Sequence, residues 1–597
     1  MAKKDRIINC HAHIFTGDHV PPYLAKTFLP APFHYLVPLS FFVRLFRFWY
    51  KYPDTWQFKP WYINMKQFIY RIKIAGTRSR FSSLIASLIG VFLTVHVFYI
   101  LFNWLLHVEK LGGDTVAMLN GWQNWLNEHH LLHIPHAFVL KLLLILLLVV
   151  FFKPGRNVIF FILKKLGSFF KALPGPKSKE LIGRYLNIGR FAFYRKQARI
   201  LGRLKDQYPQ GTGFVILPMD MEYMEAGKLK KGYRYEDQMA ELKKIKANRA
   251  HKDDVFPFVF ADPRRIVEQG KKQLDYTVKN GTVTLNDCFI REYIEENQFS
   301  GFKIYPALGY YPFDEALLPL WKYAADNGLP IMTHCIRGTI FFRGNKKKEW
   351  DTHPVFEQAG GNGTYEPLLL MEIQNRDFIN NFTHPLNFLC LLNESMLRKL
   401  VGKAKDPRIR ELFGYTGPET EMHYNLSHLK VCFGHFGGDD EWNRFLEMDR
   451  YNYANQVIQF PDTGIRFLKG ANGKPVPGKL EQIWKYADWY SIICSLMLQY
   501  PNVYADLSYI IHSPGIQPLL KHTLMNPGLK ERVLYGTDFY VVRNHKSEKN
   551  MLAETVDHLL DQEFDQIARI NPVHFLKNKL PVSNNPPGLN LTQAQTN

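Results

Sequence analysis

Residues 301–335 read GFKIYPALGYYPFDEALLPLWKYAADNGLPIMTHC. Two short apolar runs open and close this stretch, at 301–306 and 329–335, and the residues between them have the spacing of a helix. A strand, a helix and a second strand in this order are typical of a parallel α/β sheet. The first run carries Lys303 and the second carries His334. The stretch therefore predicts a βαβ unit with a polar side chain on each strand.

The same alternation recurs along the chain on both sides of residues 21–210, and it yields eight apolar runs in all. The runs are 6–13, 214–220, 255–262, 301–306, 329–335, 429–435, 502–508 and 532–538. Eight strands that alternate with helices predict a (β/α)8 barrel, whose active site lies at the carboxyl ends of the strands. A flat doubly wound sheet also accommodates eight strands, but it gathers polar residues at one crevice. Here a His, Asp or Lys stands at the end of most runs, which favours the barrel.

Charge divides the chain into two parts. The 597 residues carry 75 Lys and Arg against 54 Asp and Glu, a formal charge of +21, and 15% of them are aromatic, which excludes a disordered chain. Residues 21–210 hold 26 of the basic and six of the acidic residues, so +20 of the charge belongs to this segment. We therefore predict a first barrel strand within 1–20, a basic insertion at 21–210, the rest of the barrel at 211–580 and a flexible tail at 581–597.

The insertion contains two long apolar stretches, at about 81–108 and 136–152. The first is long enough for the roughly 20 residues that cross a bilayer, whereas the second is shorter and contains Lys141. Basic residues crowd the two outer flanks, but the connection between the stretches has only Lys110, so the positive-inside rule predicts a transmembrane hairpin with both ends in the cytoplasm. Two buried helices of a soluble domain and a re-entrant hairpin are the alternatives. Residues 158–173 alternate apolar turns with lysines and predict an interfacial helix or an ordinary surface helix.

The place of the insertion supplies a check on the number of spans. In a closed barrel the first strand pairs with the second and the eighth, so both ends of an insertion between the first two strands lie on one side of a membrane. An even number of spans is then required. The prediction is a protein of the cytoplasmic membrane with its barrel facing the cytoplasm and its basic segment against anionic lipid head groups. We expect no nucleic-acid partner, because the chain has no zinc-finger, RNP or helix-turn-helix signature, and the oligomeric state, a homodimer included, stays open.

The six cysteines are scattered along the chain and form no CxxC pair. Three of them fall inside strand-like runs. Reduced, buried thiols have this distribution, whereas a disulfide framework in a small secreted domain does not. We therefore predict free thiols.

The first strand carries a pair of histidines, His11 and His13, separated by one residue. Residues i and i+2 of a strand point to the same face, so both imidazoles can enter one coordination sphere. His334, His435 and Asp538 stand at the ends of the fifth, sixth and eighth predicted strands. Several imidazoles with one carboxylate suit Zn²⁺ or a similar divalent ion, and a catalytic site leaves one position for water. The five residues predict a metal-dependent active site.

Five motifs in this order resemble the amidohydrolase superfamily: NCHAHIF, GFKIYPALGYYPFDEALLPLWKYAADNGLPIMTHC, LKVCFGHFGG, NVYADLS and RVLYGTD. The resemblance is to the amidohydrolase-related branch (amidohydrolase 2), which includes aminocarboxymuconate-semialdehyde decarboxylase and related metal-dependent hydrolases. It covers residues 5–20 and about 211–565, and the segment 21–210 is foreign to it.

The resemblance implies roles for the five polar residues. It implies that His11, His13, His334 and Asp538 bind one divalent metal ion, most often zinc. It further implies that His435 polarises the substrate or orients the attacking water, and that Asp538 is the base as well as a ligand.

Three residues near these motifs raise separate points. The first-strand pattern of the family begins with Asp, whereas this chain has Asn9, which removes a carboxylate that supports the site. A fourth-strand lysine is carbamylated and bridges two metal ions in parts of the superfamily, but the motif here matches the mononuclear branch, so we expect Lys303 to be a substrate-binding or structural cation. Arg337 is suited to a bidentate contact with a substrate carboxylate, and a salt bridge within the cap (residues 336–426) is the equal alternative.

A long connection, residues 336–426, separates the fifth and sixth strands, and we expect it to cap the mouth of the barrel. Tyr305 and His384 are candidate pocket residues, with simple packing as the alternative. The implied activity is hydrolysis of an ester, a lactone or an amide by a water that the metal activates. The alternatives are a metal-dependent decarboxylase of an unsaturated or aromatic acid and a catalytically silent scaffold anchored to the membrane.

Overall fold

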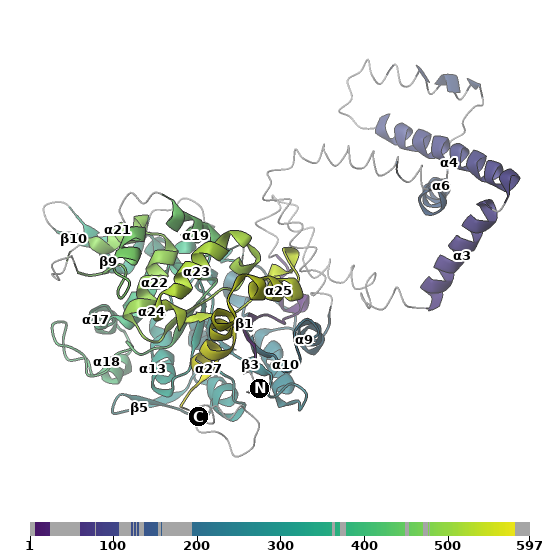
Figure 1. Ribbon diagram of the computed structural model, residues 1–597. Helices are drawn as coiled ribbons and strands as arrows, with labels where there is room; N and C mark the ends of the chain where they lie inside the picture. The colour runs from purple at the N-terminus through teal and green to yellow at the C-terminus, as the bar shows by residue number, and fades with distance from the viewer. Residues whose placement is uncertain are drawn as a thin grey trace. The chain divides into compact units, whose positions relative to one another are not determined.

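The computed structural model divides the chain into two compact units, one formed by Met1–Phe48 with Gly183–Asn597 and the other by Trp49–Ile182. The two units are described separately (Figure 1). The residues described are 6–23, 60–77, 79–106, parts of 117–129, 137–152, 157, 194–338, 340–360, 364–370, 378–447, 453–469, 476 and 478–579. The predicted tail at 581–597 and the predicted helix at 158–173 lie outside them.

Parallel strands form the centre of the first unit; each predicted run contains one, except 255–262, which contains two. They are β1 (Ile8–Ala12), β2 (Gly213–Ile216), β3 (Val255–Pro257), β4 (Val259–Phe260), β7 (Phe302–Ile304), β8 (Ile331–His334), β11 (Val431–Gly434), β12 (Val503–Asp506) and β13 (Val533–Leu534). One sheet has the order β1-β2-β3 and the other β13-β12-β11-β8-β7-β4. All these pairs are parallel, so the α/β architecture with parallel strands is confirmed.

Backbone hydrogen bonds connect the two sheets at two places, along the run that contains β3 and β4 and between β1 and the residues after β13. β3 and β4 belong to one extended run, in which the Phe258 N–H donates to the carbonyl of Ile216 at 3.0 Å, while the next N–H, of Val259, donates to Gly301 at 2.9 Å. At the other end the Asp538 N–H donates to the carbonyl of His11 at 2.9 Å. The last strand is thus connected to the first, and the carboxyl ends of β1 and β13 come together.

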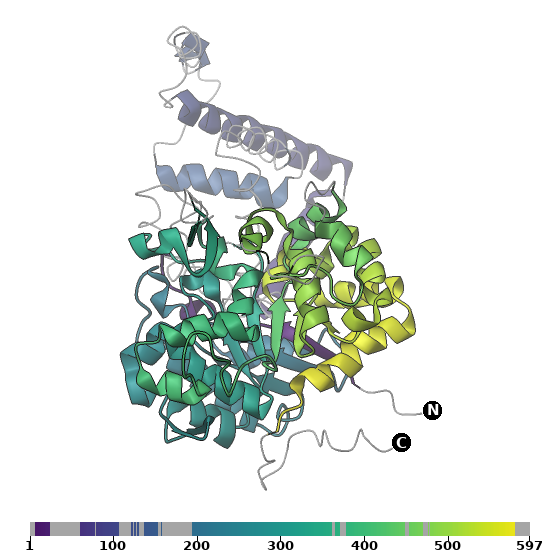
Figure 2. The ribbon, with the colours of Figure 1, turned by 90° about the vertical axis from the view of Figure 1, so that its left-hand side faces the viewer.

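Helices lie around the strands in both views of the first unit (Figure 1 and Figure 2). α13 (Leu318–Asn327) follows β7 and ends at Gly328, which has φ 67° and serves as the left-handed cap that commonly ends a helix. Other helices of this layer are α9 (Gln197–Lys205), α10 (Tyr235–Ala247), α22 (Trp489–Gln499), α23 (Gln517–Met525), α25 (Glu548–His558) and α27 (Asn571–Leu576). Their apolar faces pack on the strands, most of them in one extensive buried cluster and those of α27 in a second, smaller one.

Two antiparallel hairpins were not among the predicted elements. β5 (Tyr276–Lys279) and β6 (Thr282–Leu285) are joined by Asn280 and Gly281, which both have positive φ, the conformation of a two-residue hairpin turn. β9 (Thr352–Ala359) and β10 (Tyr365–Leu369) form the second hairpin, inside the segment that was expected to be a cap. Both connections contain an Asn-Gly pair, Asn280-Gly281 and Asn362-Gly363, so both turn signals were readable in the sequence.

The second unit consists of helices in its described part. These are chiefly α3 (Pro60–Thr77), α4 (Arg80–Leu106) and α6 (Phe138–Phe151). α4 and α6 pack through a small buried cluster of Leu93, Val97 and Leu148. Both helices fall on the predicted apolar stretches, so the helical interpretation of those stretches is supported.

Only one helix in the described part of the chain has the length and composition to cross a membrane. It is the segment Arg80–Leu101 of α4, which has 22 residues. The 18-residue stretch that meets the criterion has a mean hydropathy of 2.3 and is 28% buried. The 14 residues of α6 rise about 21 Å, which is less than the roughly 30 Å of a bilayer's hydrocarbon core. The length criterion therefore supports the first predicted span and not the second.

Candidate active site

Three of the predicted ligands come together at the junction of the first and last strands. His11 and His13 lie at the end of β1 and Asp538 follows β13, and ligand atoms of the three lie within 4.8 Å of one another. Oδ1 of Asp538 is 3.3 Å from Nε2 of His13 and 3.9 Å from Nε2 of His11. All three side chains are buried. The pairing of β1 with the residues after β13 therefore brings together two strand ends that are more than 500 residues apart in the sequence.

The backbone at these positions departs from regular structure. The pairing of β1 with β2 shifts register between Asn9 and Ala12, which brackets His11. Asp538 and His435 have φ values of 62° and 75°, in the left-handed region that non-glycine residues rarely adopt. Strained conformations of this kind persist where the surrounding structure determines them, and they cluster at functional sites.

A second group of polar atoms, from Asp506 and Ser508, holds the ring of His11 in place. Oδ2 of Asp506, at the end of β12, lies 2.9 Å from Nδ1 of His11, while Oδ1 accepts the backbone N–H of His435 at 3.1 Å. The Ser508 hydroxyl donates a short hydrogen bond to Asp506 and lies 2.9 Å from Nδ1 of His435. Because a carboxylate only accepts, it fixes the His11 proton on Nδ1, which is how an acidic neighbour orients a metal-binding imidazole.

The same reasoning assigns the protons of the remaining histidines. Nδ1 of His13 faces the carbonyl of Leu217 at 2.8 Å and therefore carries the proton. Nδ1 of His435 faces the carbonyl of Ser508 at 3.2 Å, so its Nε2 accepts from Nδ1 of His334 at 3.0 Å. His11, His13 and His334 are thus each left with an unprotonated Nε2. Those of His11 and His334 are buried with no hydrogen-bond partner among the described residues.

His334 lies beside the three-residue group and is connected to it through His435. Its ring stacks on Tyr305, with centroids 3.8 Å apart and planes inclined by 14°. Burial lowers the pKa of His334 and of His11 well below the usual range, and neighbouring cationic groups act in the same direction. Burial likewise lowers the pKa of His435 to about 4, against the opposing effect of the Asp538 carboxylate. The imidazoles are neutral, which is the protonation state that binds a metal ion.

Lys303 occupies the interior of the strand layer. It is in register with Met332 of β8, and its ammonium is buried with no hydrogen-bond partner in the described structure. Burial lowers the pKa of Lys303 to about 8, although the carboxylates of Asp506 and Asp538 favour the charged form. Lys303 is therefore a cation beneath the site, and its predicted role toward the substrate stays a prediction.

The two predicted substrate residues of the cap have other partners. Arg337 is 53% exposed and forms an ion pair with the buried Glu441 at 3.3 Å. Glu441 belongs to α19 (Asp439–Leu446), outside the cap, so this is not the salt bridge within the cap that was the alternative. His384 stacks on Trp484, with centroids 3.9 Å apart, and its Nδ1 accepts the N–H of Leu386 at 3.2 Å. A contact of either residue with a substrate stays a prediction.

A divalent metal ion fits the residues present. Three imidazoles present lone pairs in one buried region, and the Asp538 carboxylate lies within 4 Å of two of them. Unpartnered buried nitrogen atoms are costly unless a further group satisfies them. Nitrogen donors with one carboxylate oxygen are the donor set of catalytic zinc sites.

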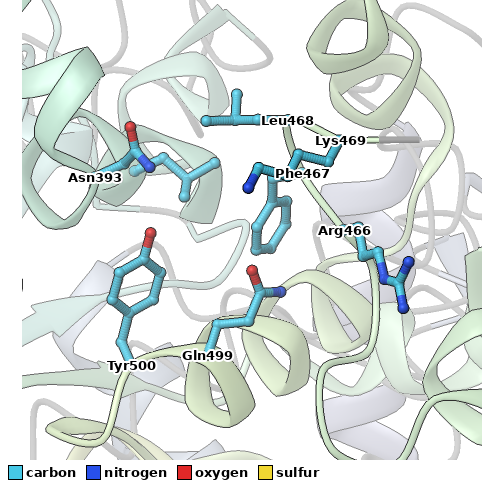
Figure 3. A pocket seen from close by; sticks show the side chains of 8 residues that line it. Asn393, Arg466, Phe467, Leu468, Lys469, Gln499 and Tyr500 are labelled. Carbon is cyan, nitrogen blue, oxygen red and sulfur yellow. The ribbon is translucent and has the colours of Figure 1, made fainter. Parts of the chain in front are cut away.

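A separate cavity of about 240 Å³ lies away from these residues (Figure 3). It is lined by Leu389, Asn393, Arg466, Phe467, Leu468, Lys469, Gln499 and Tyr500. The amide of Gln499 already donates to the carbonyls of Thr463 and Ile465, and the Asn393 side chain caps the helix that follows it. These polar groups are committed to the fold, so we assign no function to the cavity.

Comparison with known proteins yields no family assignment. No protein-family model matches the chain, and no curated protein matches it. Among solved structures, an uncharacterised TIM-barrel protein from Bordetella bronchiseptica is 12% identical with a TM-score of 0.28, over 63% of this chain and 81% of that one. An amidohydrolase from Mycobacterium avium subsp. paratuberculosis K-10 is 13% identical with a TM-score of 0.27, over 64% of this chain and 74% of that one. These scores are low, so we base the function on the contacts of this chain.

Proposed function

We propose that the chain is a metal-dependent hydrolase built on a closed (β/α)8 barrel. One observation carries the proposal: the unprotonated Nε2 atoms of His11 and His13 lie 3.9 and 3.3 Å from the Asp538 carboxylate in a buried group, which His334 adjoins through its hydrogen bond to His435. Closure of the barrel is supported by the hydrogen bond from Asp538 to His11, which connects the last strand to the first. Without closure, Asp538 and the two histidines of β1 would stand at opposite edges of a sheet.

The residues of the site divide the chemistry between them. A divalent ion held by these donors would supply the Lewis acidity that polarises a carbonyl and acidifies a water molecule. Asp538 would accept the proton of the attacking water, because its carboxylate lies 3.3 Å from Nε2 of His13 and 3.9 Å from Nε2 of His11, beside the position of the ion. His435 is held by Ser508 and by His334, so its ring has a fixed orientation beside the site. Lys303 would stabilise negative charge at the site, since the carboxylates of Asp506 and Asp538 favour its charged form.

Metal analysis of the purified full chain tests the proposal. We expect about one Zn²⁺ or Mn²⁺ per chain in the wild type, and a loss of most of it in His13→Ala and Asp538→Asn. His353→Gln is the matched control, because His353 is also buried but lies in β9 of the cap. A wild type with less than about 0.2 metal per chain, unchanged by the substitutions, would refute the enzyme and leave a silent scaffold.

The reaction is assigned by a substrate panel on the metal-loaded chain. Esters, lactones and amides represent hydrolysis, and unsaturated and aromatic acids represent decarboxylation. Hydrolytic turnover that is lost in Asp538→Asn supports the proposal. Release of carbon dioxide from the acids, without turnover of any ester, lactone or amide, would instead assign a metal-dependent decarboxylase.

We further propose that the second unit anchors the protein to the cytoplasmic membrane, with the barrel in the cytoplasm. Support comes from α4, whose apolar side chains Leu84, Leu88, Val91 and Phe98 are each more than half exposed in the isolated chain. Apolar surface on this scale, along a helix of membrane-spanning length, matches a lipid environment.

Carbonate extraction of membranes tests the anchor. The full chain should stay in the membrane pellet and dissolve in detergent. The double substitution Leu88→Lys and Val91→Lys should release it, because a lysine near the centre of a span costs about 3 kcal/mol. Gln67→Lys, which adds a charge to the exposed surface of α3, is the control. Wild-type protein in the soluble fraction would refute the anchor.

A further inference from the structure

A buried carboxylate lies on the outer side of the strands beneath the site. Glu548, the first residue of α25, is 0% exposed. One oxygen, Oε2, accepts two hydrogen bonds, from the Tyr208 hydroxyl at 2.7 Å and from the Thr537 hydroxyl at 2.6 Å. Tyr208 follows α9 and Thr537 directly precedes Asp538. The carboxylate thus connects a helix of the surrounding layer to the residue next to a predicted metal ligand.

The direction of these hydrogen bonds determines the orientation of Asn9. A hydroxyl has one proton, and both protons are donated to Glu548, so the two oxygens present only lone pairs to their other neighbours. The side-chain nitrogen of Asn9 donates to exactly these two oxygens, at 2.9 Å to Tyr208 and 2.8 Å to Thr537. Both N–H bonds of the amide are then used, and its oxygen is left to accept the backbone N–H of His11 at 3.1 Å.

The network therefore reaches the metal-binding residues from two sides. The hydrogen bond from His11 to Asn9 lies in the irregular part of β1 that turns His11 toward Asp506. Thr537 fixes the chain immediately before Asp538, which has a positive φ. If the two hydroxyl protons no longer pointed to Glu548, they would point toward the N–H groups of Asn9. A buried donor that lacks an acceptor costs about 1–3 kcal/mol.

We propose that Glu548 is a positioning residue: its oxygen Oε2, which accepts both hydroxyl protons, fixes the direction of this network and so holds Asn9, His11 and Asp538 in the arrangement that binds the metal ion. The inference rests on the proposed metal-dependent function. It also accounts for the neutral Asn9 on the first strand, because the carboxylate that accepts the two hydroxyl protons is that of Glu548.

A transfer of the carboxylate between the two positions tests the proposal. In Glu548→Met the two hydroxyl protons lose their acceptor and point toward the N–H groups of Asn9, and in Asn9→Asp two carboxylates compete for the two hydroxyl protons. In the double variant Asn9→Asp with Glu548→Met, the hydroxyls donate to the carboxylate at position 9, so every donor again has an acceptor. Glu548→Gln should behave as the wild type, because its amide oxygen can take the place of Oε2 and accept both hydroxyl protons. Glu554→Gln, on the same helix, is the control, since its carboxylate is 42% exposed and pairs with Lys546.

The first readout is the affinity of the full chain in detergent for Zn²⁺, measured by competition with a chromophoric chelator. We expect Glu548→Met and Asn9→Asp each to bind Zn²⁺ about 10–100-fold more weakly, and the double variant to return to within about threefold of the wild type. Additive losses in the double variant, or an affinity that Glu548→Met leaves unchanged, would overturn the proposal, because a residue that only stabilises the fold gives no reciprocal rescue.

The second readout needs no metal. Hydrogen exchange of the peptide that covers residues 6–15, in metal-free protein, reports the hydrogen bond between His11 and Asn9. Faster exchange in Glu548→Met and in Asn9→Asp, with recovery in the double variant, supports the network, whereas unchanged exchange in Glu548→Met overturns it. If the wild type binds no Zn²⁺, the proposed function fails, and this exchange measurement alone decides the inference.

Discussion

His353 in the cap hairpin provides a prediction whose size follows from its contacts. Its Nδ1 accepts two backbone N–H groups, from Val355 at 3.1 Å and Phe356 at 2.9 Å, and its Nε2 lies 3.0 Å from the side-chain oxygen of Asn387. This arrangement fits only a neutral ring with its proton on Nε2, because a proton on Nδ1 would face two donors. Burial accordingly lowers the pKa of His353 from 6.5 to about 3.

The sign and magnitude of the pH dependence follow from this pKa. The folded pKa lies below the unfolded value, so the stability that the neutral ring contributes is fully present above about pH 6.5 and is lost as the pH falls toward 3. Each unit of pKa corresponds to about 1.4 kcal/mol, so the full effect is about 5 kcal/mol. Between about pH 7 and about pH 5 the equilibrium for local opening should rise about 25-fold, or about 2 kcal/mol.

Hydrogen exchange measures this opening without unfolding the whole chain. Protection factors of the peptide that covers β9, corrected for intrinsic exchange at each pH, should fall about 25-fold from pH 7 to pH 5 in the wild type. His353→Gln should lower protection at pH 7 and remove most of the pH dependence. His423→Gln, at an exposed position of the same unit, should leave both unchanged. A wild-type hairpin with pH-independent protection would refute the assignment of a neutral, buried His353.

Three further predictions concern other parts of the chain. Arg265→Met should destabilise the first unit by about 3–5 kcal/mol, because the buried Asp220 carboxylate loses its ion-pair partner at 2.6 Å. The effect is measured as a lower melting temperature, and Arg249→Met, at an exposed site, is the control. Leu148→Ala should expose the α4–α6 connection to protease, since the lost packing costs about 2–5 kcal/mol, whereas Leu146→Ala, at an exposed position, should not. Every cysteine is buried and free, so less than about one thiol per native chain should react quickly with a disulfide reagent, and all six should react after unfolding. Rapid reaction of several thiols in the native protein would contradict the structure.

The strands could be predicted because their signal is local. Each of the eight runs is short, apolar and bounded by polar or turn residues, and each contains an observed strand, from Ile8–Ala12 to Val533–Leu534. The histidine pair on the first strand could be recognised for a related reason, since alternation along a strand fixes which residues share a face. The contact of this pair with Asp538 required the additional assumption that the last strand returns to the first.

The support of the site could not be read from the sequence in the same way. Asp506 and Ser508 lie in one predicted run, but their bonds to His11 and His435 depend on the mutual placement of three strands. Glu548 carries no sequence signal, because a carboxylate in the first turn of a helix is normally a solvent-exposed favourable charge. Its burial depends on two hydroxyls from distant parts of the chain.

Tyr208 connects these observations to the organisation of the chain. It lies just after α9, where the chain has returned from the second unit to the first, and its hydroxyl sits between Glu548 and Asn9. The insertion therefore does not end in a passive linker. Its return segment supplies one of the two hydroxyls that orient the first strand, so a replacement of the whole segment 21–210 by a short linker would remove a hydrogen-bond partner of Asn9 together with the apolar helices. A truncation intended to test only the membrane anchor has to retain α9 and Tyr208 if the site is to keep its geometry.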